Sequence, residues 1–161
     1  MAREYLKKAP LTSRTDASDV NATVQGILDD IAARGDDAAR EYALKFDRYE
    51  GSLKLSRADI EAAAAKVPEK LKADIRFAHA NVKKFAEAQK ASLTDFETEI
   101  VPGLIAGQRA IPVNAAGCYI PGGRYAHIAS AIMTVTTAKV AGCGSIVACS
   151  PPRPDQGIAP A

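Results

Sequence analysis

The chain has 161 residues, of which 47% are hydrophobic and 25% are charged, a composition typical of a globular protein. Its 21 basic and 19 acidic residues are interspersed and leave a net charge of +2, so no basic face for nucleic acid is expected. No stretch approaches the roughly 18 consecutive apolar residues of a membrane helix, and the N-terminus lacks the apolar core of a signal peptide. We therefore expect neither a nucleic-acid partner nor a membrane partner.

The three cysteines indicate a reducing compartment. Cys118, Cys143 and Cys149 are odd in number and lack Cys-x-x-Cys spacing, so neither a disulfide framework nor a zinc ribbon is expected. All three stand in apolar surroundings and are predicted to be small core residues. A cytoplasmic location follows as the expectation.

Residues 1–95 are predicted to form a helical N-terminal region. Apolar residues recur at helical spacing after the capping candidates Asp16 and Ser18, and Gly35 is predicted to end that first helix. Asp36 is predicted to cap a second helix. A short strand is expected after Gly51, followed by a helix that Ser56 caps.

A longer helix is predicted to begin at Pro68, a residue that suits the first turn of a helix. Apolar side chains repeat along it at intervals of three and four residues, which places them on one face. This face is predicted to pack inward and consists of Leu71, Ile75, Ala78, Val82 and Phe85.

Residues 96–161 are predicted to begin a Rossmann-like α/β domain. Alternating residues from Phe96 to Ile100, a Pro-Gly turn and the segment 104–113 predict two extended stretches joined by a turn. The stretch "GCYI", a helix from about Tyr125 to Ala141 and the run "SIVACS" then predict a βαβ unit with parallel strands.

This βαβ unit is incomplete as a sheet. A lone pair of parallel strands leaves both edges unpaired and one face uncovered. We therefore expect an α/β chain that is the N-terminal part of a longer protein, truncated within its parallel sheet. Exposed apolar surface is expected for the same reason.

The stretch "GCYIPGGRYAH", residues 117–127, is the candidate functional site. A strand, a glycine-rich turn and a helix start place backbone N–H groups and the positive end of a helix dipole beside an anion. Gly122 and Gly123 allow close approach of the backbone and positive φ angles. The spacing matches neither the dinucleotide fingerprint nor the P-loop, so a tight turn without a ligand remains the alternative.

Two side chains that can carry positive charge stand at the predicted helix start. A cation there is disfavoured by about 0.3–1 kcal/mol, which makes Arg124 and His127 more reasonable if they share an anion with the helix amides. The planar donor fork of arginine suits carboxylate, phosphate or sulfonate oxygens. A solvated arginine and a surface histidine remain the alternative. Tyr119 ends the strand at the carboxyl edge, where its ring either meets a flat cofactor or packs in the core.

The chain is not expected to hold a catalytic centre. It has only two histidines, and no paired acidic cluster stands near either, so neither a zinc site nor a Ser-His-Asp triad is predicted. His79 is interpreted as a residue at the edge of a packed helix face. The stretch therefore supplies one wall of a site, with no catalytic residue and no metal ligand.

The segment "GCYIPGGRYAHIASAIMTVTTAKVAGCGSIVACSPP" resembles the glycine-turn region of the histidinol dehydrogenase family. The upstream segments "RGDDAAREYALKFD" and "PGLIAGQRAIPV" resemble the same family in the same order, so the similarity covers nearly the whole chain. After the glycine pair, enzymes of histidine biosynthesis usually carry small or apolar residues with Ser or Thr and Pro. Arg124, Tyr125 and His127 are instead similar to the sulfopropanediol 3-dehydrogenase branch.

The resemblance implies an NAD-dependent, zinc-requiring dehydrogenase that oxidises a primary alcohol to a carboxylate in two hydride transfers. For this branch the implied reaction converts (R)-2,3-dihydroxypropane-1-sulfonate to sulfolactate; oxidation of L-histidinol to L-histidine is the alternative. Tyr119 matches a family contact to NAD, with Gly122 and Gly123 shaping the turn beside it. Arg124 and His127 are the residues expected to bind the substrate.

The resemblance also implies parts that lie beyond this chain. The zinc ligands and catalytic bases belong to the portion after Ala161, so we expect the 161-residue chain alone to be inactive. Family members are homodimers, so a homodimer is expected for the longer protein. A non-catalytic module, in which the helical part mediates association and the βαβ unit merely packs, is the alternative from another class.

Overall fold

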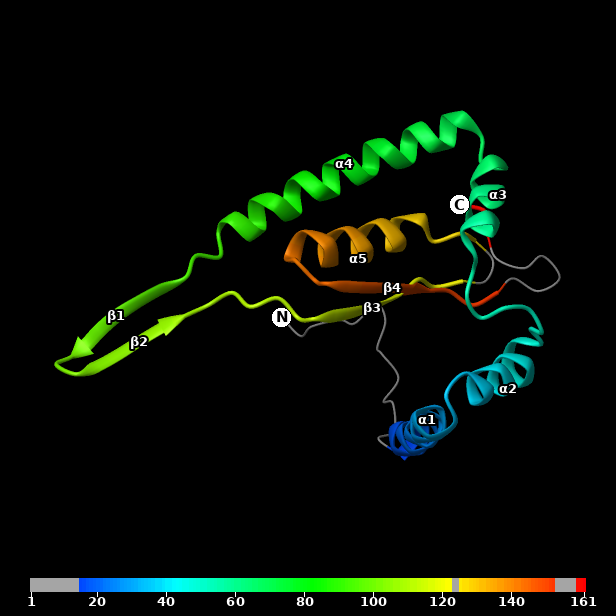
Figure 1. Cartoon of the computed structure of the whole chain (residues 1–161), viewed down its shortest axis with the longest axis horizontal. Coiled ribbons are helices and arrows are strands. Elements are labelled where there is room, and N and C mark those ends of the chain that lie inside the picture. The colour runs from blue at the N-terminus through cyan, green and yellow to red at the C-terminus, as the bar shows by residue number, and fades with distance from the viewer. Residues whose placement is uncertain (1–14, 123–124, 153–158) are drawn as a thin grey trace, which may run out of the picture. The chain divides into compact units, whose positions relative to one another are not determined.

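The computed structural model describes residues 15–122, 125–152 and 159–161. Within them, helices and short sheets confirm the predicted α/β class (Figure 1). The chain separates into two compact units, Met1–Leu53 and Lys54–Ala161, and each is described by itself. The domain boundary predicted at residue 95 stays a prediction. None of the helices in the described ranges combines the length and apolarity required to cross a membrane.

The first unit contains a helical hairpin of α1 (Thr15–Arg34) and α2 (Asp36–Asp47). The side chain of Ala38, on α2, is completely buried. The linking residue Gly35 has a φ of 63°, a conformation that favours glycine, and its N–H donates to the carbonyl of Ile31 at 2.8 Å. The predicted end of the first helix is therefore confirmed.

The predicted N-terminal caps of these two helices are wrong. Asp16 and Ser18 already lie within α1 (Thr15–Arg34), so neither is an N-cap. Gly35, and not Asp36, precedes α2, and Asp36 is already helical. An acidic residue in a first turn is still favourable, because it lies beside the positive end of the helix dipole.

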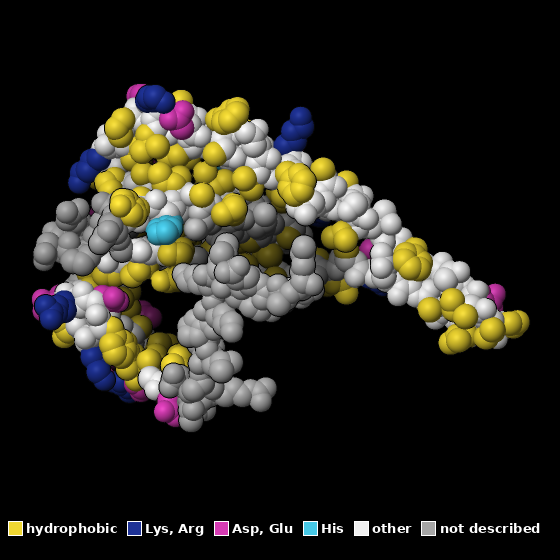
Figure 2. All heavy atoms as spheres, turned by 180° about the vertical axis from the view of Figure 1, so that it is seen from behind, with side chains coloured by type: hydrophobic (Ala, Val, Ile, Leu, Met, Phe, Trp, Pro, Cys, Tyr) yellow, Lys and Arg dark blue, Asp and Glu magenta, His cyan; other side chains and the backbone are white. Residues whose placement is uncertain are grey.

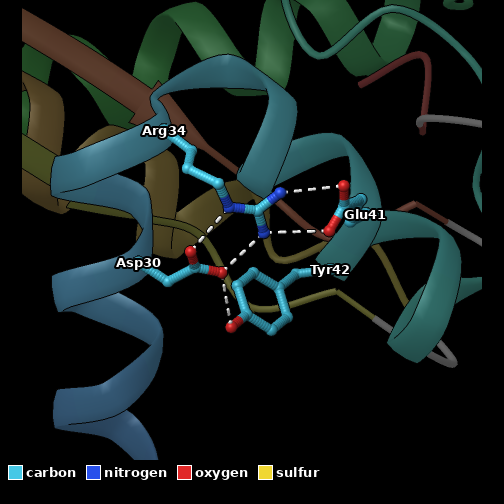
Figure 3. A network of polar contacts seen from close by, with 4 residues as sticks. All are labelled: Asp30, Arg34, Glu41 and Tyr42. Carbon is cyan, nitrogen blue, oxygen red and sulfur yellow. Dashed lines mark hydrogen bonds and ion pairs between the residues drawn. The ribbon is translucent and has the colours of Figure 1, made fainter.

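A network of charged side chains joins α1 to α2 (Figure 3). The Arg34 guanidinium donates to both Asp30 oxygens at 2.7 Å and to both Glu41 oxygens at 2.9 Å. The Tyr42 hydroxyl donates to Asp30 Oδ2 at 3.0 Å. These hydrogen bonds, from Arg34 first and then Tyr42, lower the pKa of Asp30 to about 2. One guanidinium thus holds a carboxylate from each helix.

The second unit begins with α3 (Arg57–Ala65), which Ser56 caps as predicted. Ser56 Oγ accepts from the Asp59 N–H at 3.2 Å, and the Asp59 carboxylate accepts from the Ser56 N–H at 2.9 Å. The strand predicted just before Ser56 is wrong. That segment forms bends, and the carbonyl of Ser52 accepts from the Tyr49 hydroxyl at 3.1 Å instead of from a partner strand.

Helix α4 (Glu69–Ala91) packs alongside α5 (Ile128–Ala141) (Figure 1). Pro68 is the residue before α4 and not its first helical residue. The predicted inward face is correct through Val82, but Phe85 is 66% exposed and Ala86 is buried. A step of four residues from Val82 keeps the contact on the face that meets α5, whereas a step of three leads to the outside.

Strands β1 (Phe96–Val101) and β2 (Leu104–Gln108) form an antiparallel hairpin, which confirms the two extended stretches and their turn. Gly103 in the turn has a φ of 84°. The second stretch is shorter than predicted and ends at Gln108. Every residue of both strands is exposed, and Figure 2 shows hydrophobic side chains along this end of the molecule.

Strands β3 (Ala115–Tyr119) and β4 (Ser145–Cys149) precede and follow α5 in the chain and pair with each other in parallel, which confirms the predicted βαβ unit. Gly142, with a φ of 101°, ends α5 as predicted. The helix begins at Ile128, later than the predicted Tyr125.

The cysteine prediction is correct only in part. Cys118 is 4% exposed, Cys143 is half-buried and Cys149 is exposed. Among the elements that the structure describes, α5 is the one that packs against β3 and β4, so it covers a single face of this sheet. An apolar side chain on the other face of the β3–β4 sheet is therefore accessible to solvent.

Candidate functional site

The candidate site lies at the carboxyl edge of the parallel strands. Tyr119, the last residue of β3, is in register with Cys149, the last residue of β4. The Ile120 N–H donates to the Cys149 carbonyl at 2.8 Å, which extends the pairing by one step. The chain segments that leave the two strands therefore start side by side. In open α/β sheets, ligands bind outside this edge.

A cavity of about 310 Å³ opens at this edge. The turn after β3 contributes Gly122 and Tyr125, the residue before α5 contributes His127, and the segment after β4 contributes Ser150 and Pro151. Most of the remaining lining is apolar, including Ile75 from α4. An apolar wall with a few convergent polar groups is typical of a site for a small molecule.

Gly122 is required by the packing of this corner. A Cβ atom at Gly122 would stand 2.5 Å from Pro151 Cγ and 3.0 Å from the Pro151 carbonyl oxygen. Its φ is not in the left-handed region. The sequence predicted a glycine here because the backbone is closely approached. The structure shows that the segment after β4 is what approaches Gly122. Its role toward a cofactor stays a prediction.

Among the described residues, no acidic side chain caps the start of α5. His127 is the N-cap residue and makes no side-chain capping hydrogen bond, and the first turn contains no acidic residue. A helix start leaves backbone N–H groups without intrahelical partners, and its dipole favours negative charge. The cavity therefore meets an uncapped helix start, and the exposed imidazole of His127 lies beside it.

The structure brings together only some of the predicted site residues. Gly122 and His127 line the same cavity. Tyr119 ends β3 as predicted and is 62% exposed, but it does not line that cavity. Gly123 and Arg124 lie outside the described residues, so their roles stay predictions.

Most residues that line the cavity were not predicted as site residues, among them Ser150, Pro151, Tyr125 and Ile75. Ser150 and Pro151 could have been found, because parallel strands bring the segments that follow them to one edge. Tyr125 was predicted as the approximate start of a helix and named in the family resemblance, but it was not predicted as a site residue. Ile75 was predicted on the inward face of its helix, but its place at the cavity depends on how α4 packs against α5.

The described residues around this corner do not supply a metal site. Within the described ranges, no three His, Cys, Asp or Glu side chains lie close enough together to hold a metal ion. Zinc in proteins takes three or four such ligands. The prediction that zinc ligands lie outside this chain stays a prediction, and no reaction step is assigned to zinc here.

Comparison with known proteins gives a consistent result. A model of the family described as histidinol dehydrogenase matches residues 11–161. Sulfopropanediol 3-dehydrogenase of Ruegeria pomeroyi is 73% identical over 161 residues, which are all of this chain and 37% of that protein. Histidinol dehydrogenase of Methanosarcina barkeri is 37% identical over 93% of this chain and 35% of that protein.

The crystal structure of histidinol dehydrogenase from Elizabethkingia anophelis has a similar fold. It superposes with a TM-score of 0.75 at 29% sequence identity and covers 98% of this chain and 34% of its own. The chain thus spans 37% or less of the length of these relatives. The family resemblance found in the sequence is confirmed.

Proposed function

Because the chain belongs to the histidinol dehydrogenase family, we propose that it is part of an NAD-linked dehydrogenase that oxidises a primary alcohol bearing a sulfonate. The observation that carries this proposal is the 73% identity, over the whole chain, to a protein named sulfopropanediol 3-dehydrogenase. The proteins named histidinol dehydrogenase are less similar; that of Methanosarcina barkeri is 37% identical. The uncapped helix start beside the cavity also favours a substrate with negative charge.

The proposed reaction converts (R)-2,3-dihydroxypropane-1-sulfonate to sulfolactate. In balanced form, one alcohol, one water and two NAD⁺ give one carboxylate, two NADH and three protons. NAD would accept the two hydrides, and the resemblance adds zinc, for which the described residues offer no ligand set. The part played by this chain is binding and orientation of the two ligands at one sheet edge.

Each predicted site residue has a place in this proposal. Tyr119 would stack on a flat part of NAD, which its exposed ring at the carboxyl edge allows. Gly122 and Gly123 would form the turn beside the dinucleotide. Arg124 and His127 would hold the sulfonate together with the first amides of α5; support comes from His127, which lines the cavity at that helix start.

The cellular setting is proposed on indirect grounds. Cys118, Cys143 and Cys149 are all free, which fits a reducing compartment such as the cytoplasm. Large exposed hydrophobic side chains, such as Met133 and Val147, need cover from further protein. We propose a homodimer of the longer protein as one source of that cover.

L-Histidinol is the second candidate substrate. It is supported by the 37% identity to an archaeal histidinol dehydrogenase and by the similar crystal structure. Its imidazole and ammonium groups carry no negative charge, so the positive end of the helix dipole at the start of α5 does not attract them.

The test compares the two alcohols on the longer protein that contains this chain. We expect NADH formation from the sulfonate diol in a ratio of two NADH per alcohol, with kcat/KM at least about 100-fold above that for L-histidinol. Zinc-loaded protein and a stereochemically pure diol are needed. A preference for L-histidinol, or a ratio of one NADH per alcohol, would contradict the proposal. The 161-residue chain alone serves as the inactive control.

A further inference from the structure

A second groove, larger than the site cavity, runs between α4 and α5. Its volume is about 910 Å³. The apolar part of its lining consists of small and branched side chains, namely Ala91, Ala131, Ile132, Val135 and Val140. Thr136 also lines the groove, but it is only 6% exposed and offers little polar surface. The other lining residues are polar and exposed, and they form the rim: His79, Lys83, Glu87, Lys90 and Lys139.

The groove has the length of about three helical turns. Along α4 it extends from His79 to Lys90, and along α5 it extends from Ala131 to Val140. At 1.5 Å per residue, these spans are about 16 Å and about 14 Å. Rows of side chains along two packed helices form a surface that accepts the ridge of a third helix. A helix of about 11 residues would fill the groove from end to end.

One end of the groove adjoins the end of the described chain. The groove and the site cavity share Ala131 and Ile132, in the first half of α5. Ala159 and Ala161 line the same site cavity, together with Ile75 from the first half of α4. Figure 1 likewise marks the C-terminus near the ends at which α4 and α5 begin. A chain that continues from Ala161 therefore starts at the entrance of the groove.

The topology of the sheet gives this continuation a direction. β4 ends at the carboxyl edge, so a further parallel strand requires that the chain first return to the opposite edge, as α5 does between β3 and β4. Within the described residues, β4 pairs only with β3, and its other edge is unpaired. A right-handed crossover to a strand at that edge places the connecting helix on the face that α5 covers. Such a helix runs in the same direction as α5 and alongside it.

The same polypeptide is a better source of this helix than a separate protein. The chain spans 37% or less of the length of the relatives named above, so the longer protein has polypeptide to supply. Pro160 suits the first turn of a helix, where the missing N–H group is not needed. A segment attached at the entrance of the groove is present there at a high effective concentration, which a separate partner does not have.

We propose that the groove between α4 and α5 is covered by a helix of the same polypeptide, formed by the residues that directly follow Ala161 in the longer protein. An apolar stripe of this helix would pack on Val135 and Val140, and the stems of the rim lysines would flank it with their ammonium groups in solvent. The first turn of the helix would lie at the site cavity, where its free amides would join those at the start of α5. This packing requires neither NAD nor the sulfonate, so its test is separate from that of the proposed function.

Labelling of a cysteine placed in the groove provides the test. Val135→Cys lies on the floor of the groove, and Lys84→Cys, at an exposed position of α4 that does not line the groove, is the control. Each variant is made in the 161-residue chain, in this chain extended by about 16 of the residues that follow it, and in the longer protein. The tryptic peptides 125–139 and 84–90 contain no native cysteine, so mass spectrometry measures each reaction with maleimide separately.

We expect the thiol of Val135→Cys to react at least about tenfold more slowly in the extended chain and in the longer protein than in the 161-residue chain, because the helix covers it. The thiol of Lys84→Cys should react at the same rate in all three proteins. Dilution by roughly 100-fold should not change the protection, since the helix is covalently attached. Ala131→Cys, in the same tryptic peptide, replaces Val135→Cys if circular dichroism shows that the latter is unfolded.

Three results would overturn the proposal. Equal rates for Val135→Cys in the 161-residue chain and in the longer protein would show that nothing covers the groove. Protection in the longer protein but not in the extended chain would assign the groove to a different segment. Protection that is lost on dilution would assign it to a second copy of the protein.

Discussion

Replacing Gly122 with alanine is expected to lower the free energy of unfolding by about 1–3 kcal/mol, the usual cost of overpacking a tight contact. The added Cβ would stand 2.5 Å from Pro151 Cγ and 3.0 Å from the Pro151 carbonyl oxygen. A proline ring cannot swing aside as a flexible side chain does, so one of the two segments must move. Urea unfolding of the 161-residue chain measures the effect without any ligand.

Gly117→Ala is the matched control for this substitution. Gly117 lies in β3, shortly before Gly122, and an added Cβ there would meet nothing within 4 Å. Its effect is expected to stay within about 1 kcal/mol, because alanine mainly restricts the unfolded chain. Equal stability of the two variants would show that the contact with Pro151 does not explain the glycine. In the longer protein, Gly122→Ala should also reduce NAD-linked turnover, because it displaces the cavity wall.

Arg124→Ala in the longer protein is expected to reduce kcat/KM for the sulfonate diol by roughly 10- to 150-fold. This range corresponds to the about 1.5–3 kcal/mol of a hydrogen bond to a charged group. Arg124→Lys should restore part of the loss, since it keeps the charge and removes the planar fork. Steady-state NADH formation with varied diol provides the measurement.

Arg109→Ala is a suitable control for the loss of one arginine. Arg109 pairs with Glu97 at 3.2 Å, and neither residue lines the cavity. We expect its turnover of the sulfonate to match that of the unsubstituted protein. An unchanged rate in Arg124→Ala, or the same loss with L-histidinol as with the diol, would remove Arg124 from the sulfonate site.

The parts of the fold that were predictable from the sequence are those with local chemistry. Ser56 and Asp59 form a capping box within four residues, and Gly142 ends α5 in the left-handed conformation. The turn at Gly103 likewise depends on its own backbone. In each case the structural cause lies within one turn of the chain, so a sequence pattern can express it.

The errors occur where tertiary packing decides the outcome. Periodicity alone does not distinguish Phe85 from Ala86 as the inward residue of α4, because both continue the pattern from Val82. The exposure of Cys149 depends on which face of the sheet α5 covers. The start of α5 at Ile128 could not be placed, because the residues before it carry no capping side chain that marks it.

For the candidate site too, the features with local causes were predictable and the tertiary contacts were not. The parallel strands and the turn after β3 were predictable, and with them the sheet edge at which the site lies. The close contact between Gly122 and Pro151 was not predictable: parallel strands bring the two segments to one edge, but the distance between them depends on how the segments pack. Sequence patterns therefore predicted the sheet edge at which the site lies, and the structure shows which residues pack against it.

A crystal structure of the longer protein, soaked with NAD⁺ and the sulfonate diol, tests the central claim most directly. The expected result is a dinucleotide against the ring of Tyr119 and a sulfonate at the first amides of α5, within hydrogen-bond distance of His127. Both ligands bound elsewhere, with this corner of the sheet empty, would contradict the proposed function.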